Sequence, residues 1–181
     1  SDFTAWVAVA VCDGIEACCC LRPQIKWTND IILNGKKLVG ILTELSLVSE
    51  TNTLDYLVTG IGVNVNQDPE DFSQEVREMA TSLSQALGHP VRRADLAAQI
   101  ILALDRMYAG YPEDRAEYLK KYRAGCITTG RQVQLITPTA RRQAFALEID
   151  DDFNLVVEHY NGKRETISAG EVSVRGMYGY V

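Results

Sequence analysis

Apolar residues recur at helical spacing in several stretches of the chain. Residues 4–21 are rich in Ala, Val and Cys and end before Arg22-Pro23, which predicts a mostly buried helix. The alternation of Val7, Val9 and Val11 is also compatible with a strand. Residues 93–108 carry an amphipathic pattern that predicts a second long helix. The residues of its apolar stripe are Leu96, Ile100, Leu104 and Met107.

Two further helices are expected from their start and stop signals. Residues 73–87 predict a helix that is interrupted near Thr81 and ends at Gly88. Pro112 opens a helix over residues 113–123, which ends near Gly125. The buried side of this last helix is predicted to consist of Tyr118, Leu119 and Tyr122.

Runs of strand length form two groups along the chain. The first group comprises residues 25–33, 36–47 and 54–65. The second group comprises the short runs 132–137, 143–150, 154–160, 164–168 and 172–175. Short strands separated by turn residues are typical of a small barrel. We therefore expect an α+β protein with a domain boundary near residues 127–130, dividing the chain into 1–128 and 129–181.

Composition narrows the class of protein. The chain has 181 residues, is 46% hydrophobic and carries a net charge of −6, which argues against a dedicated nucleic-acid binder. No apolar run has the length of a membrane span. The five cysteines form no Cys-x-x-Cys pair, and His89 and His159 are isolated, so no metal site is predicted. Reduced thiols used as small apolar residues favour a cytoplasmic protein.

The dipeptide Asn34-Gly35 lies between two of the predicted strands, and it is the strongest short-range signal for a hairpin. A two-residue loop pairs Leu33 with Lys36. The residue numbers of each opposing pair then add up to the same total. This register places Lys37 opposite Ile32, Val39 opposite Asp30, and Gly40 opposite Asn29.

This register gathers charge on an apolar hairpin. Side chains alternate between the two faces of a strand, so Lys26, Asp30 and Lys37 share one face. Asp30 and Lys37 become diagonal neighbours, roughly 7–8 Å apart. Gly40 lets another molecule approach the sheet closely. A solvated charge pair on a surface hairpin is the alternative, but the residue types favour a functional site.

Two glycines in the next predicted strand extend this pattern. Gly60 and Gly62 are two residues apart, so they expose backbone on one face of the strand. A β-bulge or a tight packing contact would use the same residues. Beside the charged hairpin, we interpret them as a second wall of one pocket.

Three motifs together resemble the catalytic domain of biotin protein ligases. They are Lys-Trp-x-Asn-Asp at 26–30, Lys-Leu-x-Gly-Ile-Leu at 37–42 and Gly-Ile-Gly-Val-Asn at 60–64. The family usually has Pro where this chain has Thr28, an exchange that touches no charged group. The resemblance implies an antiparallel or mixed sheet with packed helices, followed by a small SH3-like β-barrel. The segment 170–175 also resembles the end motif of the family.

The resemblance implies a two-step reaction. Biotin and ATP form biotinyl-5'-AMP and pyrophosphate with the help of Mg²⁺, and biotin then passes to a lysine of a biotin carboxyl carrier protein. The family often dimerises through the edge of its sheet. No nucleic acid or membrane is expected as a partner of this chain.

The resemblance also assigns roles to residues. Lys37 is expected to stabilise the negative charge that develops at the α-phosphate, and Asp30 to position Lys37, a metal ion or the incoming amine. The residues expected to bind biotin are Lys37, Gly40, Leu42, Gly60 and Ile61. The residues expected near ATP or the adenylate are Lys26, Trp27, Asn29, Asn64 and Arg175. Glu171 and Arg175 are expected to contact nucleotide or carrier, or to form a salt bridge between barrel and core.

Members of the family carry a segment with a Gly-Arg-Gly-Arg loop before the position that corresponds to the first helix here. This sequence contains no such loop, so we expect the catalytic domain to be incomplete at its N-terminus and turnover to be impaired. Two alternatives follow. One is a non-catalytic module that binds biotin, adenylate or a carrier, and the other is a lipoate-type ligase. The spacing of the three motifs favours biotin over lipoate.

Overall fold

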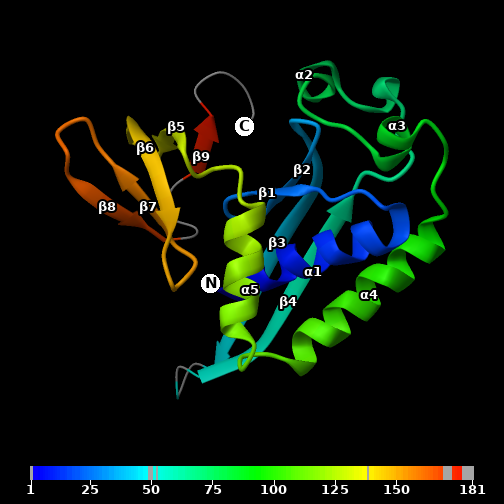
Figure 1. Cartoon of the computed structure of the whole chain (residues 1–181), viewed down its shortest axis with the longest axis horizontal. Helices are drawn as coiled ribbons and strands as arrows, with labels where there is room; N and C mark the ends of the chain where they lie inside the picture. The colour runs from blue at the N-terminus through cyan, green and yellow to red at the C-terminus, as the bar shows by residue number, and fades with distance from the viewer. Residues whose placement is uncertain (1, 49–50, 52, 138, 169–172, 177–181) are drawn as a thin grey trace.

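The computed structural model describes residues 2–48, 51, 53–137, 139–168 and 173–176. Its strands form two antiparallel sheets, one with the order β1-β2-β3-β4 and one with the order β8-β7-β6-β5-β9 (Figure 1). The α+β prediction is confirmed. No helix among the described residues is long and apolar enough to cross a membrane.

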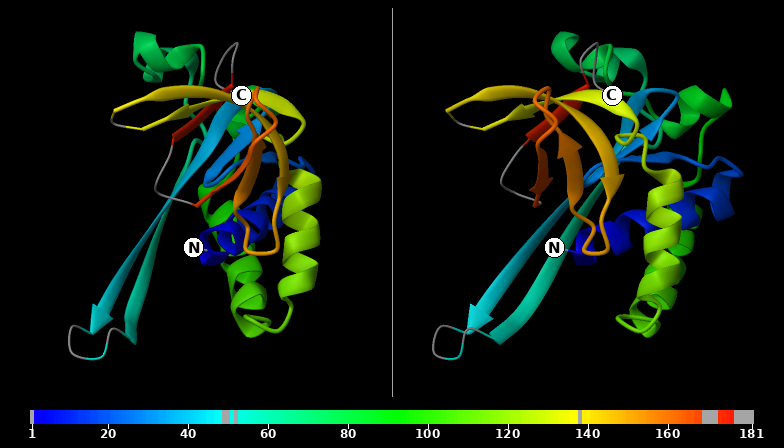
Figure 2. Two further views of the ribbon diagram at one scale, coloured as in Figure 1. Left: turned by 90° about the vertical axis from the view of Figure 1, so that its left-hand side faces the viewer. Right: turned by 60° about the vertical axis from the view of Figure 1, so that its left-hand side comes forward.

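The first sheet consists of β1 (Gln24–Lys26), β2 (Asp30–Leu33), β3 (Lys36–Val48) and β4 (Thr53–Val63). The prediction of one strand over residues 25–33 is wrong, because the chain turns at residues 27–29 and β1 pairs antiparallel with β2. The far half of the β3–β4 hairpin extends away from the rest of the molecule (Figure 2).

Three long helices lie on one side of the molecule (Figure 1): α1 (Asp2–Cys19), α4 (Arg93–Ala109) and α5 (Arg115–Gly125). Both α1 and α5 contact strands of this sheet, whereas α4 packs against α1. The buried helix predicted over residues 4–21 is confirmed, and it is buried along most of its length because it lies between the sheet, α4 and α5. Gly14 allows the close contact with α4, since a Cβ there would lie 2.7 Å from the Cα of Ile100. The Trp6 ring stacks on Tyr118 of α5, with ring centroids 4.1 Å apart.

The segment between β4 and α4 contains η1 (Pro69–Asp71), α2 (Gln74–Arg77) and α3 (Leu83–Leu87). The break predicted near Thr81 is confirmed, and its cause is pairing with the first sheet. The Lys37 N–H donates to the carbonyl of Met79 at 2.7 Å, and the Thr81 N–H donates to the carbonyl of Lys37 at 3.0 Å. The helix ends at Gly88 in the left-handed conformation, as predicted.

The second sheet consists of β5 (Arg131–Ile136), β6 (Arg141–Ile149), β7 (Leu155–Glu158), β8 (Arg164–Ile167) and β9 (Ser173–Gly176). All five predicted strands are present. In the described strands β8 and β9 lie at opposite ends of the strand order, so this sheet is open and does not close into a barrel.

Both sheets contribute to one continuous core. The strand β1 lies where they meet: the Ile127 N–H donates to the carbonyl of Ile25 at 2.9 Å, and the Trp27 indole donates to the carbonyl of Phe153 at 2.9 Å. The division into domains 1–128 and 129–181 therefore stays a prediction.

Candidate functional site

The hairpin around Asn34-Gly35 contains a β-bulge. Leu33 pairs with Lys36 and Ile32 with Lys37, as predicted, but the register shifts between Ile31 and Ile32. Gly40 therefore lies opposite Asp30 and not Asn29, and Val39 lies opposite Ile31 and not Asp30. These two predicted pairs are wrong by one position because Leu38 is the extra residue of the bulge.

The bulge does not separate the charges that were expected on one face. The Lys37 Nζ lies 2.5 Å from the Asp30 Oδ1, so the two residues form an ion pair. Lys26 is the partner of Asp30 in the β1–β2 ladder, which places both side chains on one face of the sheet. The predicted grouping of Lys26, Asp30 and Lys37 is confirmed.

Lys26 is the most buried of these charged residues, with 7% of its surface exposed. Burial is the main cause that lowers the pKa of its ammonium from 10.5 to about 8. The charge of Asp30 opposes this shift, whereas Lys37 and Arg175 add to it. Arg175 on β9 thus acts on the same group of charges from the second sheet.

A pocket of about 530 Å³ opens beside this group. All five residues expected to bind biotin line it, together with Asp30 and Asn29. Gly40 lies directly against the catalytic candidate, since a Cβ at this position would lie 3.3 Å from Lys37 Cε. The lining residues are Asn29, Asp30, Lys37, Gly40, Ile41, Leu42, Gly60, Ile61 and Gly62.

A second pocket of about 430 Å³ adjoins the first, because Lys37, Gly40 and Gly62 line both. Its other wall is apolar and comes from the segment after β4. The sequence did not identify the three apolar residues of this wall, Phe72, Val76 and Met79. Val76 and Met79 are 42% and 40% exposed. Large apolar side chains that stay exposed often mark a binding surface, so their exposure is the signal that could have identified this wall.

The two asparagines shape the backbone of the pockets. The Asn29 Nδ2 donates to the carbonyl of Ile41 at 2.6 Å, and the Ile41 N–H donates back to the carbonyl of Asn29 at 3.0 Å. The Asn64 Nδ2 reaches the carbonyl of Lys37 at 3.5 Å. Both residues line a pocket, Asn29 the first and Asn64 the second.

Three predicted nucleotide contacts line neither pocket: Lys26, Trp27 and Arg175. Trp27 is buried, and its backbone N–H donates to the Thr128 hydroxyl at 2.9 Å. It therefore fixes the strand behind Lys26. Glu171 lies outside the described residues.

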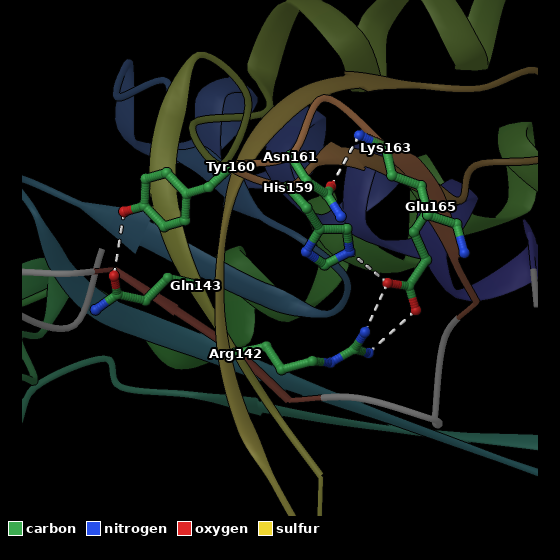
Figure 3. Close-up of a pocket in the computed structure, with 7 residues that line it drawn as sticks. All are labelled: Arg142, Gln143, His159, Tyr160, Asn161, Lys163 and Glu165. Carbon is green, nitrogen blue, oxygen red and sulfur yellow. Dashed lines mark hydrogen bonds and ion pairs between the residues drawn. The ribbon is translucent and has the colours of Figure 1, made fainter.

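The second sheet has a polar pocket of its own, with a volume of about 410 Å³ (Figure 3). Arg142 donates two hydrogen bonds to Glu165, at 2.9 and 3.1 Å, and the His159 Nε2 lies 2.6 Å from the same carboxylate. His159 was expected to be isolated, but it belongs to this cluster.

All five cysteines are free thiols, and within the described residues no group of three His, Cys, Asp or Glu side chains is placed to hold a metal ion. Burial raises the pKa of the Cys12 thiol to about 12, so this side chain serves as an apolar residue.

Residues 9–64, which include the hairpin and most of the lining of both pockets, match the model of the biotin/lipoate A/B protein ligase family. A biotin–[acetyl-CoA-carboxylase] ligase of Paracoccus denitrificans is 30% identical over 177 residues, which span 93% of this chain and 71% of that protein. The chain belongs to the biotin protein ligase family.

Other members of the biotin protein ligase family agree. The bifunctional ligase/repressor BirA of Bacillus subtilis is 38% identical over 169 residues, covering 93% of this chain and 51% of that protein. The chain thus spans about half the length of this relative. An apo biotin protein ligase of Aquifex aeolicus superposes with a TM-score of 0.85 at 23% identity, over 97% of this chain and 75% of that one, which supports the fold.

Proposed function

We propose that this chain is a biotin protein ligase that forms biotinyl-5'-AMP from biotin and ATP and transfers biotin to a lysine of a biotin carboxyl carrier protein. One observation carries the proposal: the Lys37–Asp30 ion pair lies where two adjoining pockets meet. A reaction that joins two small molecules needs both bound side by side, and a cation between the two pockets suits reactants that are both anions.

The chemistry of the first step suits this arrangement. An oxygen of the biotin carboxylate attacks the α-phosphorus of ATP, and the bond from that phosphorus to the leaving pyrophosphate breaks. Both partners are anions, so a fixed ammonium at the junction lowers the barrier by stabilising the charge of the transition state. Lys37 takes this role, and Asp30 holds its ammonium in place.

Each pocket suits one substrate. The pocket with Gly60, Ile61 and Leu42 exposes strand backbone, which can bond to the polar head of biotin. The pocket with Phe72, Val76 and Met79 offers an apolar surface to the adenine base. Asn29 and Asn64 set the backbone of both pockets, while Lys26 and Arg175 add positive charge behind Asp30.

Mg²⁺ is expected from the family resemblance. The described residues hold no group of three ligand side chains, and the carboxylate of Asp30 already bonds to Lys37, so they do not form a metal site by themselves. We therefore assign no step to Mg²⁺.

The carrier protein, the cytoplasmic setting and the two-domain division at residue 128 belong to the same proposal. The names of the relatives support the reaction, since one of them is a biotin–[acetyl-CoA-carboxylase] ligase. Self-association is part of it too, because β4 lies at the edge of the first sheet, where its backbone can pair with a second copy.

Calorimetry with biotin, with and without ATP, followed by labelling of a biotin carboxyl carrier protein, tests the proposal. A ligase binds biotin more tightly with ATP, releases pyrophosphate and labels the carrier. Binding without pyrophosphate release would instead support a non-catalytic binding module, and activity with lipoate in place of biotin would support a lipoate-type ligase. Absence of binding to any of these ligands would overturn the proposed function.

A further inference from the structure

Lys26 is a buried amine to which the adenylation step described above assigns only a charge behind Asp30. Its side chain shares a face with Asp30, which is its partner in the β1–β2 ladder. Asp30 lines the biotin pocket and Lys26 does not, and the charge of Asp30 acts on the buried amine. Among charged residues a lysine is suited to such a position, because burial shifts its pKa readily whereas arginine stays protonated.

The groups around Lys26 leave it able to change its charge near neutral pH. The charged groups that act on it are Asp30 on β2, Lys37 on β3 and Arg175 on β9. The helices α1 and α5 also pack against β1. Burial raises the pKa of their titratable groups nearest the core, Cys12 and Tyr122, so both stay neutral.

The second step of the proposed reaction requires such a group. The attacking lysine of the carrier is an ammonium at neutral pH, with an ordinary pKa of about 10.4, and an ammonium has no lone pair with which to attack. A base with a pKa near the working pH is the most effective acceptor for its proton.

We propose that Lys26 is a positioning residue that takes up, through Asp30, the proton which the carrier lysine loses before it attacks the adenylate. This inference rests on the proposed function. Asp30 receives the proton at the pocket and passes it to the neutral amine of Lys26. The nitrogen of the carrier lysine then forms a bond to the carbonyl carbon of biotin, the bond from that carbon to the phosphate oxygen breaks, and AMP leaves as an anion. The new amide nitrogen gives its second proton to water.

The direction of the pH dependence follows from the need for a neutral Lys26. The fraction of neutral amine rises as the pH passes through about 8, the value to which burial lowers the pKa of Lys26. Transfer to a carrier lysine should therefore rise with pH and level off above that point, well below the pKa of the attacking amine itself.

The test measures single-turnover transfer from preformed biotinyl-5'-AMP over roughly pH 7 to 9. Two acceptors are compared, the carrier protein and hydroxylamine, which is already neutral in this range and needs no base. Lys26→Arg keeps a positive charge but cannot accept a proton, so we expect its rate of transfer to the carrier to fall about 10²-fold. Its rate should also keep rising with pH in the range where the rate of the unsubstituted protein levels off. Transfer to hydroxylamine should fall much less, so the ratio of the two rates identifies the proton step.

Lys36→Arg is the matched control, because Lys36 neighbours Lys37 on β3 but lines neither pocket.

If Lys26→Arg fails to fold, the pH profile of the transfer rate of the unsubstituted protein decides. The relay is supported if the rate of transfer to the carrier levels off near pH 8, the pKa of Lys26, and the rate of transfer to hydroxylamine does not. A Lys26→Arg protein with an unchanged profile and rate, or equal profiles for both acceptors, would overturn the inference. Tight binding of biotinyl-5'-AMP in these experiments would show that the proposed function stands even if the relay does not.

Discussion

Each of the two sheets carries a carboxylate surrounded by basic side chains, yet the two groups differ in what surrounds the carboxylate. In the second sheet, Glu165 accepts two hydrogen bonds from Arg142 and lies 2.6 Å from His159 (Figure 3). Both of its oxygens are occupied by neighbours within the same sheet. In the first sheet, Asp30 pairs with Lys37, while a buried Lys26 and the charge of Arg175 leave the site with more positive than negative groups.

The backbone around the two carboxylates differs as well. Gly40, Gly60 and Gly62 line the pocket beside Asp30, whereas the pocket beside Glu165 is lined by polar and charged side chains without a glycine. A charged pocket alone therefore does not mark a reaction site. An excess of cations beside exposed backbone suits an anionic substrate, and a balanced cluster suits stability.

Replacement of Lys37 should have the largest effect. Lys37→Ala removes the ammonium at the junction of the two pockets, and we expect adenylate formation to fall by about 10³-fold. The side chain is 38% exposed, so the fold should remain intact. Pyrophosphate release with biotin and ATP measures the loss, and a melting curve checks the fold. Normal biotinylation by this variant would remove Lys37 from the mechanism.

Gly40→Ala should disturb the position of Lys37 without removing its charge. The added Cβ would lie 3.3 Å from Lys37 Cε and 3.4 Å from Nζ, so the ammonium must shift, and we expect kcat for adenylation to fall about tenfold. Gly60→Ala is the matched control, since its Cβ meets nothing closer than the Leu42 carbonyl oxygen at 3.9 Å. It should raise KM for biotin more than it lowers kcat, and equal effects of the two changes on kcat would contradict this picture.

Trp27→Phe tests the connection between the two sheets. The change removes the hydrogen bond to the buried carbonyl of Phe153, and we expect the free energy of unfolding to fall by about 1–2 kcal/mol beyond the packing loss. Trp6→Phe is the control for packing, because within the described residues the buried Trp6 Nε1 has no hydrogen-bond partner. Urea unfolding of both variants measures the difference, and equal losses would show that the bond contributes nothing.

Glu165→Gln should have the smallest effect, because the cluster in the second sheet is partly exposed and internally balanced. We expect a stability loss below about 1 kcal/mol and unchanged pyrophosphate release. Arg142, with His159, holds the pKa of Glu165 below its ordinary 4.5. Its contribution to stability is therefore present above that value and lost as the pH falls through the lowered pKa. A large loss of pyrophosphate release would show that the two sheets are less distinct than we argue.

Much of this molecule was predictable from the sequence. Residues 4–21 and 93–108 gave correct helices because their apolar patterns are long, and the turn at Asn34-Gly35 gave the correct hairpin loop. The biotin residues were expected from the family resemblance, and all of them line one pocket.

The errors have causes that a pattern of residues does not contain. The bulge at Leu38 inserts one residue into β3, and no glycine or proline marks that position. The turn at residues 27–29 is stabilised by contacts with Thr128 and Phe153, more than a hundred positions later in the chain. The wall formed by Phe72, Val76 and Met79 depends on how the Lys37 backbone pairs with residues 79–81, which is a tertiary contact.

The hydrogen bond between Trp27 and Phe153 also bears on how the protein folds during synthesis. The two residues are 126 positions apart, which at about 5–20 residues per second corresponds to a delay of roughly 6–25 s on the ribosome. The hairpin that carries Lys37 can form early, from local contacts alone. The contacts of Thr128 and Phe153 with the segment after β1 can form only once the last third of the chain is being synthesised. A ribosome that stalls before that point would therefore hold a nascent protein whose reactive hairpin exists but whose Lys26 is not yet enclosed.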